Sequence, residues 1–574
     1  MVLSTLDYVI LIGFFVVSLL IGLAVARQSG KNTESFFLSG RNMPWWLLGI
    51  SMVATTFAAD TPNFVAGVIR ENGVYGNWIW WSFLLTGMVT VFFYSKLWRR
   101  SGITTDLEFY ELRYSGKSAA FLRGFRAIYL GVFFNIVIMA NVCLAAIKIG
   151  HVMFGFNEFQ SLFIACSVTV VYSMLGGLRG VLLTDFVQFI IAMVGSIWAA
   201  VYIVNHEKVG GLSTMLAAPE LEGKLSFLPD FTNWEVVVPL LIIPLAVQWW
   251  SVWYPGAEPG GGGYIAQRML AAKNEKHATW ATLFFNFAHY ALRPWPWIII
   301  GMASLIVYPD LLSLQQAFPD MNPDFVRNDL SYPAMLRLLP AGLLGLVITS
   351  LVAAFMSTIS THLNWGSSYV VNDFYARFVN KDASEKSKVL VGRISTFVMI
   401  LFAALLSLKL EEALEAFNLL LQIGAGTGLL FIMRWFWRRI NPYSEITAML
   451  VSFLIAVFFF INNRLETPFV VMETHWQLVT GVVITTISWV MVTLASQPSK
   501  IETIKAFESL VFKGESKFNN FRFKFLALIM AVVGVYCFLF ATGFFIYGNT
   551  GVGLLLSSIT ILSVVVLIRI RDKF

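Results

Sequence analysis

Long runs of apolar residues, separated by short polar segments, recur along almost the whole chain. Most of them reach the roughly 20 residues that an α-helix needs to cross about 30 Å of hydrocarbon. Inside a bilayer such runs must be helical, because every backbone group has to find its hydrogen-bond partner within the segment. The pattern therefore predicts an all-α polytopic membrane protein with about fifteen spans. The spans are predicted at residues 5–26, 44–69, 75–98, 123–150, 156–174, 180–205, 233–254, 278–307, 341–371, 389–409, 413–438, 443–462, 473–496, 523–547 and 550–570.

The amino-acid composition agrees with a membrane protein and argues against several other classes of protein. Of the 574 residues, 57% are hydrophobic and 13% charged, which excludes an ordinary soluble domain. The net charge of +7 could indicate a nucleic-acid partner, but the basic residues are spread over many short loops, so none is expected. Cys143, Cys166 and Cys537 lie inside apolar runs and are interpreted as small core residues. The run at 5–26 lacks a basic start and a cleavage site, so it is interpreted as a retained helix.

The distribution of lysine and arginine predicts the orientation. The connections after the odd-numbered spans are rich in these residues, for example 96–123 and 377–393, whereas the alternate connections, such as 310–329 and 411–415, are acidic or neutral. By the positive-inside rule the basic connections face the cytoplasm. We therefore expect a multi-pass protein of the cytoplasmic (inner) membrane, with its N-terminus outside and its C-terminus inside.

Two predicted spans are interrupted. The span at 44–69 carries Thr55, Thr56, Asp60 and Pro62 at mid-membrane depth, and the span at 233–254 runs into a segment rich in proline and glycine that ends at Gly263. Broken helices in lipid are tolerated where they line a cavity, and paired breaks point to a binding site between two repeats. The alternative is that each break is a loop between two shorter helices. Together the breaks favour a transporter.

Several segments, in the right order, resemble the sodium:solute symporter family, which includes the sodium/glucose and sodium/proline transporters. The resemblance rests on these stretches: Phe36-Phe-Leu-Ser-Gly-Arg41, Glu108-Phe-Tyr-Glu-Leu-Arg-Tyr114, residues 176–188 (GGLRGVLLTDFVQ), Gln267-Arg-Met-Leu-Ala-Ala-Lys273 and Asn372-Asp-Phe-Tyr375. It implies a LeuT-like five-plus-five inverted repeat, alternating access, and sodium (Na⁺) as the co-transported ion. The implied division is a core at 1–498 and a C-terminal part at 499–574. The core comprises an extra helix at 5–26, a first repeat at 44–206, a second repeat at 233–439 and following helices at 443–496. The C-terminal part comprises a charged cytoplasmic connection and two further spans.

The ninth span contains the hydroxyls that a sodium site needs. Sodium prefers several oxygen ligands, and carbonyls of an unwound helix together with helix hydroxyls can supply them. By resemblance, the ligands are the carbonyls of Ala54, Phe57 and Ala354 and the hydroxyls of Ser357 and Thr358. In an isolated helix, such hydroxyls would simply bond to the preceding turn.

A second sodium site is a hypothesis. Some family members use an aspartate and serines closer to the cytoplasm, which here would be Asp185, Ser357, Ser360 and Thr361. The structural alternative is that Asp185 caps the N-terminus of its helix.

The substrate site is less well defined. Ionisable residues within the membrane are functional candidates by default, and the resemblance places an aromatic inner gate at Tyr264. The candidates for substrate binding and gating are Asp60, Thr56, Trp80, Glu258, Tyr264, Tyr290 and Gln422. Crowded tryptophans can stack on sugar faces, although they are also common at membrane interfaces. Sugar-carrying relatives place glutamate, asparagine and lysine where this chain has Trp80, Gly262 and Tyr290, which argues against a galactose-like binding mode.

The sequence therefore favours a symporter that imports a small organic solute, most readily a sugar-like one, with an amino acid (proline-like) or a carboxylate as the alternative. An enzyme is not expected, because no nucleophile–base pair, metal cluster or phosphate loop is present and His289 and His362 are isolated in helices. An ion channel or a transporter-like sensor is the alternative of a different class. The expected partners are the solute, sodium and the lipid bilayer, with no obligatory protein partner.

Overall fold

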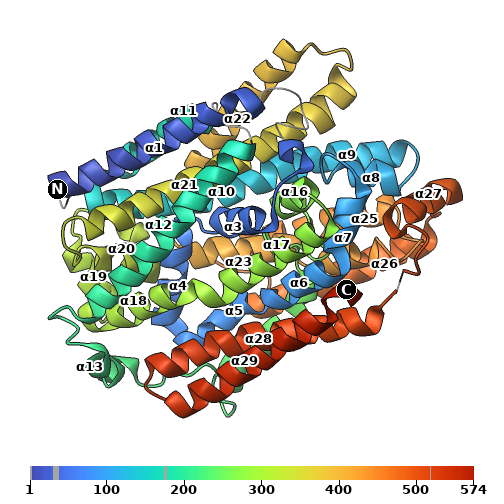
Figure 1. Ribbon diagram of the computed structural model, residues 1–574. Coiled ribbons are helices and arrows are strands. Elements are labelled where there is room, and N and C mark those ends of the chain that lie inside the picture. The colour runs from blue at the N-terminus through green and yellow to red at the C-terminus, as the bar shows by residue number, and fades with distance from the viewer. Residues whose placement is uncertain (1–2, 30–37, 174–177, 518) are drawn as a thin grey trace.

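The computed structural model describes residues 3–29, 38–173, 178–517 and 519–574, and over these residues the chain is almost entirely helical (Figure 1). The motif residues Phe36, Phe37, Gly176 and Gly177 lie outside the described ranges. Eleven helices in the described part are long and apolar enough to cross a membrane. The four other predicted spans fall on α1 (Thr5–Ser29) and on the shorter helices Trp45–Thr55, Glu158–Ser173 and Ala413–Gly424. The chain is therefore an all-helical, multi-pass membrane protein.

The first half of the chain contains one broken span followed by four others. Its elements are α1 (Thr5–Ser29), α3 (Trp45–Thr55), α4 (Asp60–Asn72), η2 (Val74–Asn77), α5 (Trp78–Trp81), α6 (Phe83–Val89), the π-helical turn η3 (Thr90–Tyr94), α7 (Ser95–Ser101), α8 (Glu108–Arg113), α9 (Lys117–Ile128), the π-helical η4 (Tyr129–Phe134), α10 (Asn135–Phe154), α11 (Glu158–Ser173) and α12 (Leu178–Val204). The predicted break is confirmed, since the helix stops at Thr55 and resumes at Asp60. Pro62 stands in the first turn of α4, where its missing N–H removes no helical hydrogen bond.

The second half repeats this order of a broken span, two long spans and two others. After α13 (Leu212–Leu216) come α14 (Trp234–Val237), η6 (Val238–Ile242), η7 (Pro244–Gln248), α15 (Trp249–Ser251), α16 (Gly263–Ala271), α17 (Glu275–Phe287), the π-helical η8 (Ala288–Leu292), α18 (Pro294–Val307), α19 (Leu311–Ala317), α20 (Ser331–Leu336), α21 (Leu343–Ser368), η11 (Tyr369–Val379), α22 (Glu385–Ser407), α23 (Ala413–Gly424) and α24 (Gly428–Met433). The second break, at residues 252–262, is also confirmed. Gly260 and Gly261 adopt φ values of +75° and +81°, which side chains other than glycine rarely adopt.

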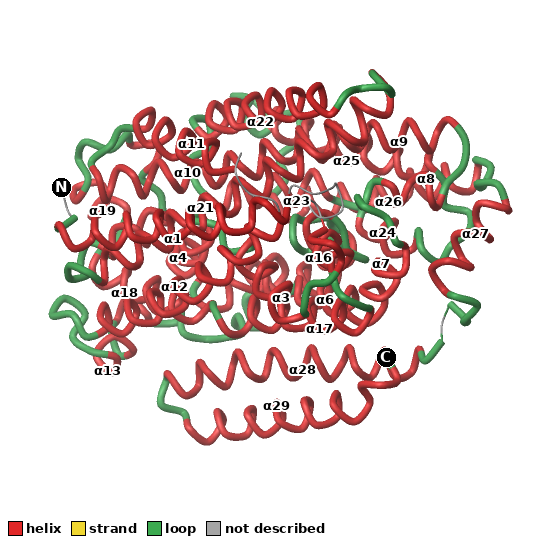
Figure 2. The backbone as a smooth tube through the Cα atoms, turned by 45° about the horizontal axis from the view of Figure 1, so that its top comes forward, coloured by secondary structure: helices red, strands yellow, loops and turns green. Residues whose placement is uncertain are grey.

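The remaining helices are α25 (Pro442–Asn462), α26 (Thr474–Ala495), α27 (Ile501–Phe512), α28 (Phe521–Ile546) and α29 (Thr550–Ile570). Helices α28 and α29 lie side by side along the outside of the bundle (Figure 2). The Tyr536 hydroxyl of α28 donates to the Trp81 carbonyl over 2.9 Å, and the Trp295 indole of α18 donates to the Leu539 carbonyl over 2.9 Å. Helix α28 is thus packed onto the second spans of both halves, and α29 packs against α28.

The broken segments are tied to their surroundings by backbone hydrogen bonds. Met43, just before α3, donates to the Ala271 carbonyl at the end of α16 over 3.2 Å, and Lys273 donates back to Met43 over 3.0 Å. In the second break the N–H of Trp253 donates to the Gly424 carbonyl over 3.2 Å, beside the interruption between α23 and α24. These bonds satisfy backbone groups that the breaks leave without a helical partner.

Candidate functional site

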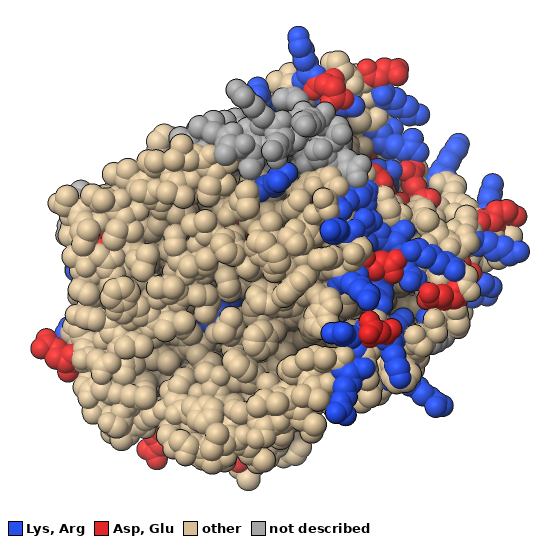
Figure 3. Space-filling view, in the orientation of Figure 1, with Lys and Arg blue, Asp and Glu red and all other residues tan. Residues whose placement is uncertain are grey.

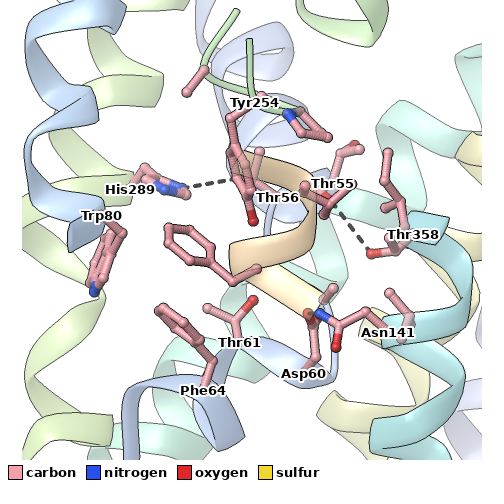
Figure 4. Close-up of a pocket in the computed structure, with 18 of the residues that line it drawn as sticks. Thr55, Thr56, Asp60, Thr61, Phe64, Trp80, Asn141, Tyr254, His289 and Thr358 are labelled. Carbon is pink, nitrogen blue, oxygen red and sulfur yellow. Dashed lines mark hydrogen bonds between the residues drawn. The ribbon is translucent and has the colours of Figure 1, made fainter. Parts of the chain in front are cut away.

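The two breaks and the long helix α21 surround a cavity of about 130 Å³ in the middle of the bundle (Figure 4). Its wall is formed by the start of α4, by α5, α10 and η8, by the second break, and by α16, α21 and α23. Five of the predicted substrate and gate residues line it: Thr56, Asp60, Trp80, Tyr264 and Tyr290. The cavity therefore lies where the paired breaks predicted a binding site.

An aspartate and an asparagine form the polar floor of this cavity. The amide of Asn141 on α10 donates to one carboxylate oxygen of Asp60 on α4. The other carboxylate oxygen, Oδ1 of Asp60, and the amide oxygen of Asn141 are both buried and have no hydrogen-bond partner among the described residues. Buried polar atoms are normally paired. These two oxygens can therefore accept hydrogen bonds from hydroxyl or ammonium groups of a bound solute.

Aromatic rings form another part of the wall. Trp80 and Tyr290 stack with their centroids 5.8 Å apart and their planes 26° from parallel, and Tyr254 stacks on Phe83 at 5.4 Å and 16°. The Trp80 indole N–H donates to the Asn77 side chain over 2.8 Å, which fixes the orientation of the ring. Flat rings held in this way offer an apolar face to one side of a ligand while the acceptors bind its polar edge.

A buried arginine caps the broken end of α3. The guanidinium of Arg293, only 2% exposed, donates to the carbonyls of Val53 (3.2 Å) and Thr56 (3.1 Å) and also contacts His289. His289 in turn lies 3.1 Å from the Thr56 hydroxyl. The last carbonyls of a helix lack partners within it and attract cations. Arg293 therefore supplies positive charge where α3 unwinds.

The predicted first sodium site lies beside this broken end. All five residues, Ala54, Phe57, Ala354, Ser357 and Thr358, are at most 5% exposed. The Thr358 hydroxyl of α21 donates a hydrogen bond to the Thr55 carbonyl over 3.4 Å. The Ala54 carbonyl accepts a hydrogen bond from the Phe57 N–H over 3.1 Å. The fold thus brings the hydroxyls of α21 against the unwound carbonyls, although the Ser357 hydroxyl is bonded to Asp185 (2.7 Å).

Asp185 is enclosed between three helices. It lies within α12, seven residues after its first residue Leu178, so the alternative that it caps a helix N-terminus is wrong. Its carboxylate is fully buried and accepts hydrogen bonds from Ser51 of α3 (2.6 Å) and Ser357 of α21 (2.7 Å). Ser360 donates to the Ser357 carbonyl over 3.1 Å, and within the described ranges the buried Thr361 hydroxyl has no partner. These four predicted residues therefore cluster in the structure.

Two predicted candidates are placed away from the cavity wall. Gln422 donates to Gln477 of α26 over 3.2 Å, and Glu258 is buried in the second break next to Gly263. Sequence reasoning missed Asn141, His289 and Tyr254, which all line the cavity. Asn141 offered the signal of an amide in an otherwise apolar run. His289, interpreted from the sequence as an isolated packed residue, could not be placed without knowing which helices face the break.

Comparisons with known proteins agree with this architecture. A family model described as the sodium:solute symporter family matches residues 36–452. The sodium/glucose cotransporter of Vibrio parahaemolyticus is 26% identical over 501 residues, which cover 84% of this chain and 90% of that protein. The sodium/myo-inositol cotransporter of Bos taurus is 26% identical over 502 residues, covering 79% and 67%.

Among solved structures, a substrate-bound, outward-open Na⁺-coupled sialic acid symporter aligns with a TM-score of 0.67 at 21% identity, covering 87% of this chain and 99% of the other. At this identity the likeness shows that the two chains share a fold. The family model covers most of the chain, which makes the protein a transporter and not an enzyme. The chain belongs to the sodium:solute symporter family and is a sodium-coupled solute symporter.

Proposed function

We propose that this symporter imports a small polyhydroxylated solute, sugar-like in its chemistry, together with sodium, by alternating access between the two repeats at 44–206 and 233–439. The observation that carries the proposal is the shared break after α3. The break faces the hydroxyls of α21, and Thr55 and Thr358, which meet there, line the same cavity as Asp60 and Asn141. Sodium bound at the break would fix the backbone that shapes the solute site, which links the two binding events.

The cavity chemistry supports a polyhydroxylated cargo. The free oxygens of Asp60 and Asn141 accept hydrogen bonds from adjacent hydroxyls, and the stacked pair of Trp80 and Tyr290 matches the apolar face of a saturated ring. Relatives named for glucose and myo-inositol transport carry solutes of this kind. Arg293 in the same wall keeps an amino acid or carboxylate as the second candidate, since a guanidinium could bind a carboxylate.

The proposed sodium ligands are the carbonyls of Ala54, Phe57 and Ala354 with the hydroxyls of Ser357 and Thr358, and Asp185, Ser357, Ser360 and Thr361 for a second ion. At about 100 mV and a tenfold gradient, each inward sodium releases roughly 3.7 kcal/mol. One ion would then sustain about 500-fold accumulation and two about 10⁵-fold. The highest ratio of internal to external solute that the protein can sustain therefore shows how many of the proposed sodium sites are used in transport.

We also propose that the end of the bundle with α8, α9 and α27 faces the cytoplasm. Lysine and arginine side chains crowd this end, while the opposite end, with the N-terminus, shows mainly scattered acidic groups (Figure 3). The charge asymmetry follows the positive-inside rule. In the proposed orientation the N-terminus lies outside and the C-terminus in the cytoplasm.

The test is uptake into proteoliposomes of labelled sugars, polyols, amino acids and carboxylates under an imposed sodium gradient. We expect one polyhydroxylated solute to accumulate in sodium but not in potassium, and Thr358→Ala to abolish the coupling. Ser367→Ala is the matched control, because this α21 hydroxyl bonds only within its own helix, to the Asn364 carbonyl. Accumulation of an amino acid or a carboxylate would refute the sugar-like cargo. Uptake indifferent to Thr358 would refute the first sodium site.

A further inference from the structure

A second buried guanidinium, that of Arg268 on α16, lies beside the proposed second sodium site. Arg268 is fully buried, yet it forms no ion pair with any described carboxylate. Its contacts are to neutral groups, and most are long: Ser51 Oγ at 3.4 Å, Thr55 Oγ1 at 3.3 Å, the Tyr264 carbonyl at 3.4 Å and Gln267 Oε1 at 3.0 Å. A buried charge held only in this way is costly unless an opposite charge lies near.

The nearby opposite charge is Asp185, and a single hydroxyl separates the two groups. Ser51 Oγ donates to Asp185 over 2.6 Å and at the same time accepts from Arg268 Nε over 3.4 Å. Asp185 is as fully buried as Arg268 and is not directly paired with a cation among the described side chains. Arg268 therefore compensates the charge of Asp185 from a short distance without occupying the space next to its carboxylate.

We infer that Arg268 and a sodium ion alternate as the counter-ion of Asp185. This inference rests on the proposed second sodium site. When sodium binds to Asp185, Ser357, Ser360 and Thr361, its charge repels the nearby guanidinium; when sodium leaves, Arg268 again balances the carboxylate through Ser51. The arginine thereby weakens sodium binding and promotes sodium release.

The position of Arg268 connects this exchange to the cavity. Tyr264 lies four residues earlier on α16, so it projects from the same helix face one turn away, and its ring contributes to the cavity wall. Arg268 also packs over that ring, with its guanidinium carbon 5.9 Å from the centroid. A displacement of Arg268 by sodium is therefore transmitted to Tyr264. Arg268 acts as a positioning residue that couples sodium occupancy to the gate.

The experiment measures binding of ²²Na⁺ to the purified full-length protein and uptake in proteoliposomes. If the charges compete, Arg268→Gln tightens sodium binding at least about tenfold and slows turnover, because release is hindered. Arg268→Lys retains the positive charge and stays closer to the wild type. When Asp185→Asn is also present, Arg268→Gln no longer changes the sodium affinity, because there is no carboxylate for which sodium and the arginine compete. A purely structural arginine would instead give weaker or unchanged sodium binding in Arg268→Gln, and that result overturns the inference.

Stability supplies a second measurement if Arg268→Gln folds poorly. Sodium should then raise the melting temperature of the variant more than that of the wild type, because the ion replaces the missing positive charge. A destabilised variant that sodium does not restore contradicts the inference. Failure of the proposed function itself would look different, since the wild type would then show no sodium-dependent uptake.

Discussion

Asn141 on α10 donates a hydrogen bond to Asp60 in the first turn of α4, at the floor of the central cavity. The bond orients the carboxylate and leaves one free acceptor on each residue. We expect Asn141→Leu, which is similar in volume, to weaken solute binding about tenfold or more, because hydrogen bonds to charged groups contribute about 1.5–3 kcal/mol.

Saturation curves for uptake would measure this loss, with sodium binding unchanged. Cys143→Ala is the control, since Cys143 is buried on the same helix and does not line the cavity. An Asn141→Leu variant with wild-type solute affinity would remove Asn141 from the site.

Arg293 holds the carbonyls of Val53 and Thr56 at the end of α3. Arg293→Gln removes the charge and shortens the reach, so the broken end should lose its fixed shape. We expect uptake to fall at least about tenfold, since two charge-assisted bonds are lost. Arg337→Gln, at an exposed arginine, should leave uptake unchanged. Equal uptake in both variants would show that the break does not depend on Arg293.

Lys148 of α10 and Asp329 form a buried ion pair, and Asp329 also accepts from the Ala413 N–H over 3.1 Å. Removing one partner leaves an uncompensated buried charge, so Lys148→Met should destabilise the protein by about 3–5 kcal/mol. The double variant Lys148→Met/Asp329→Leu should recover part of this loss. Thermal unfolding in detergent measures both effects, and a double variant less stable than the single one would contradict the account.

Glu508 of α27, outside the predicted spans, accepts a two-pronged hydrogen bond from Arg438 (2.8 and 2.6 Å) and contacts Lys517. The bond from Arg438, aided by Lys517, lowers the pKa of Glu508 from 4.5 to about 2. A lowered carboxyl pKa stabilises the folded state above about pH 4.5, and that contribution is lost as pH falls towards 2.

We therefore expect the wild type to exceed Glu508→Gln in melting temperature at pH 7 and this advantage to shrink below pH 4.5. The effect should be about 1 kcal/mol or less, because Arg438 is half exposed. An advantage that is constant from pH 7 to pH 3 would exclude the ion pair as its source.

The features of this fold that depend on the local sequence could be predicted, whereas those that depend on contacts between distant helices could not. Proline is tolerated only in the first turn of a helix, and glycines weaken a helix interior, so Pro62 and the glycines at 260–263 made both breaks predictable. The partners of the ionisable residues were not, because they depend on which helices pack together. Asp185 contacts Ser51, 134 residues earlier, and nothing in the sequence near either residue indicates the pair.

The interruption within the predicted span at 413–438 could not be predicted for a related reason. In the structure the run at 413–438 contains α23, an interruption at 425–427 and α24. Gly428 lies against the backbone of Trp250 and Ser251, a long-range approach that no local pattern encodes.

The attachment of α28 to Trp81 and Trp295 has a mechanical consequence. These residues belong to the second span of each half, so α28 links the two spans and holds them at a fixed separation. We expect the three parts to move as one rigid body while the cavity opens and closes. A spin label on the native Cys537 of α28 would then serve as a fixed reference point. The distance from it to a second label at the exposed Phe397 of α22 would measure how far α22 moves during transport.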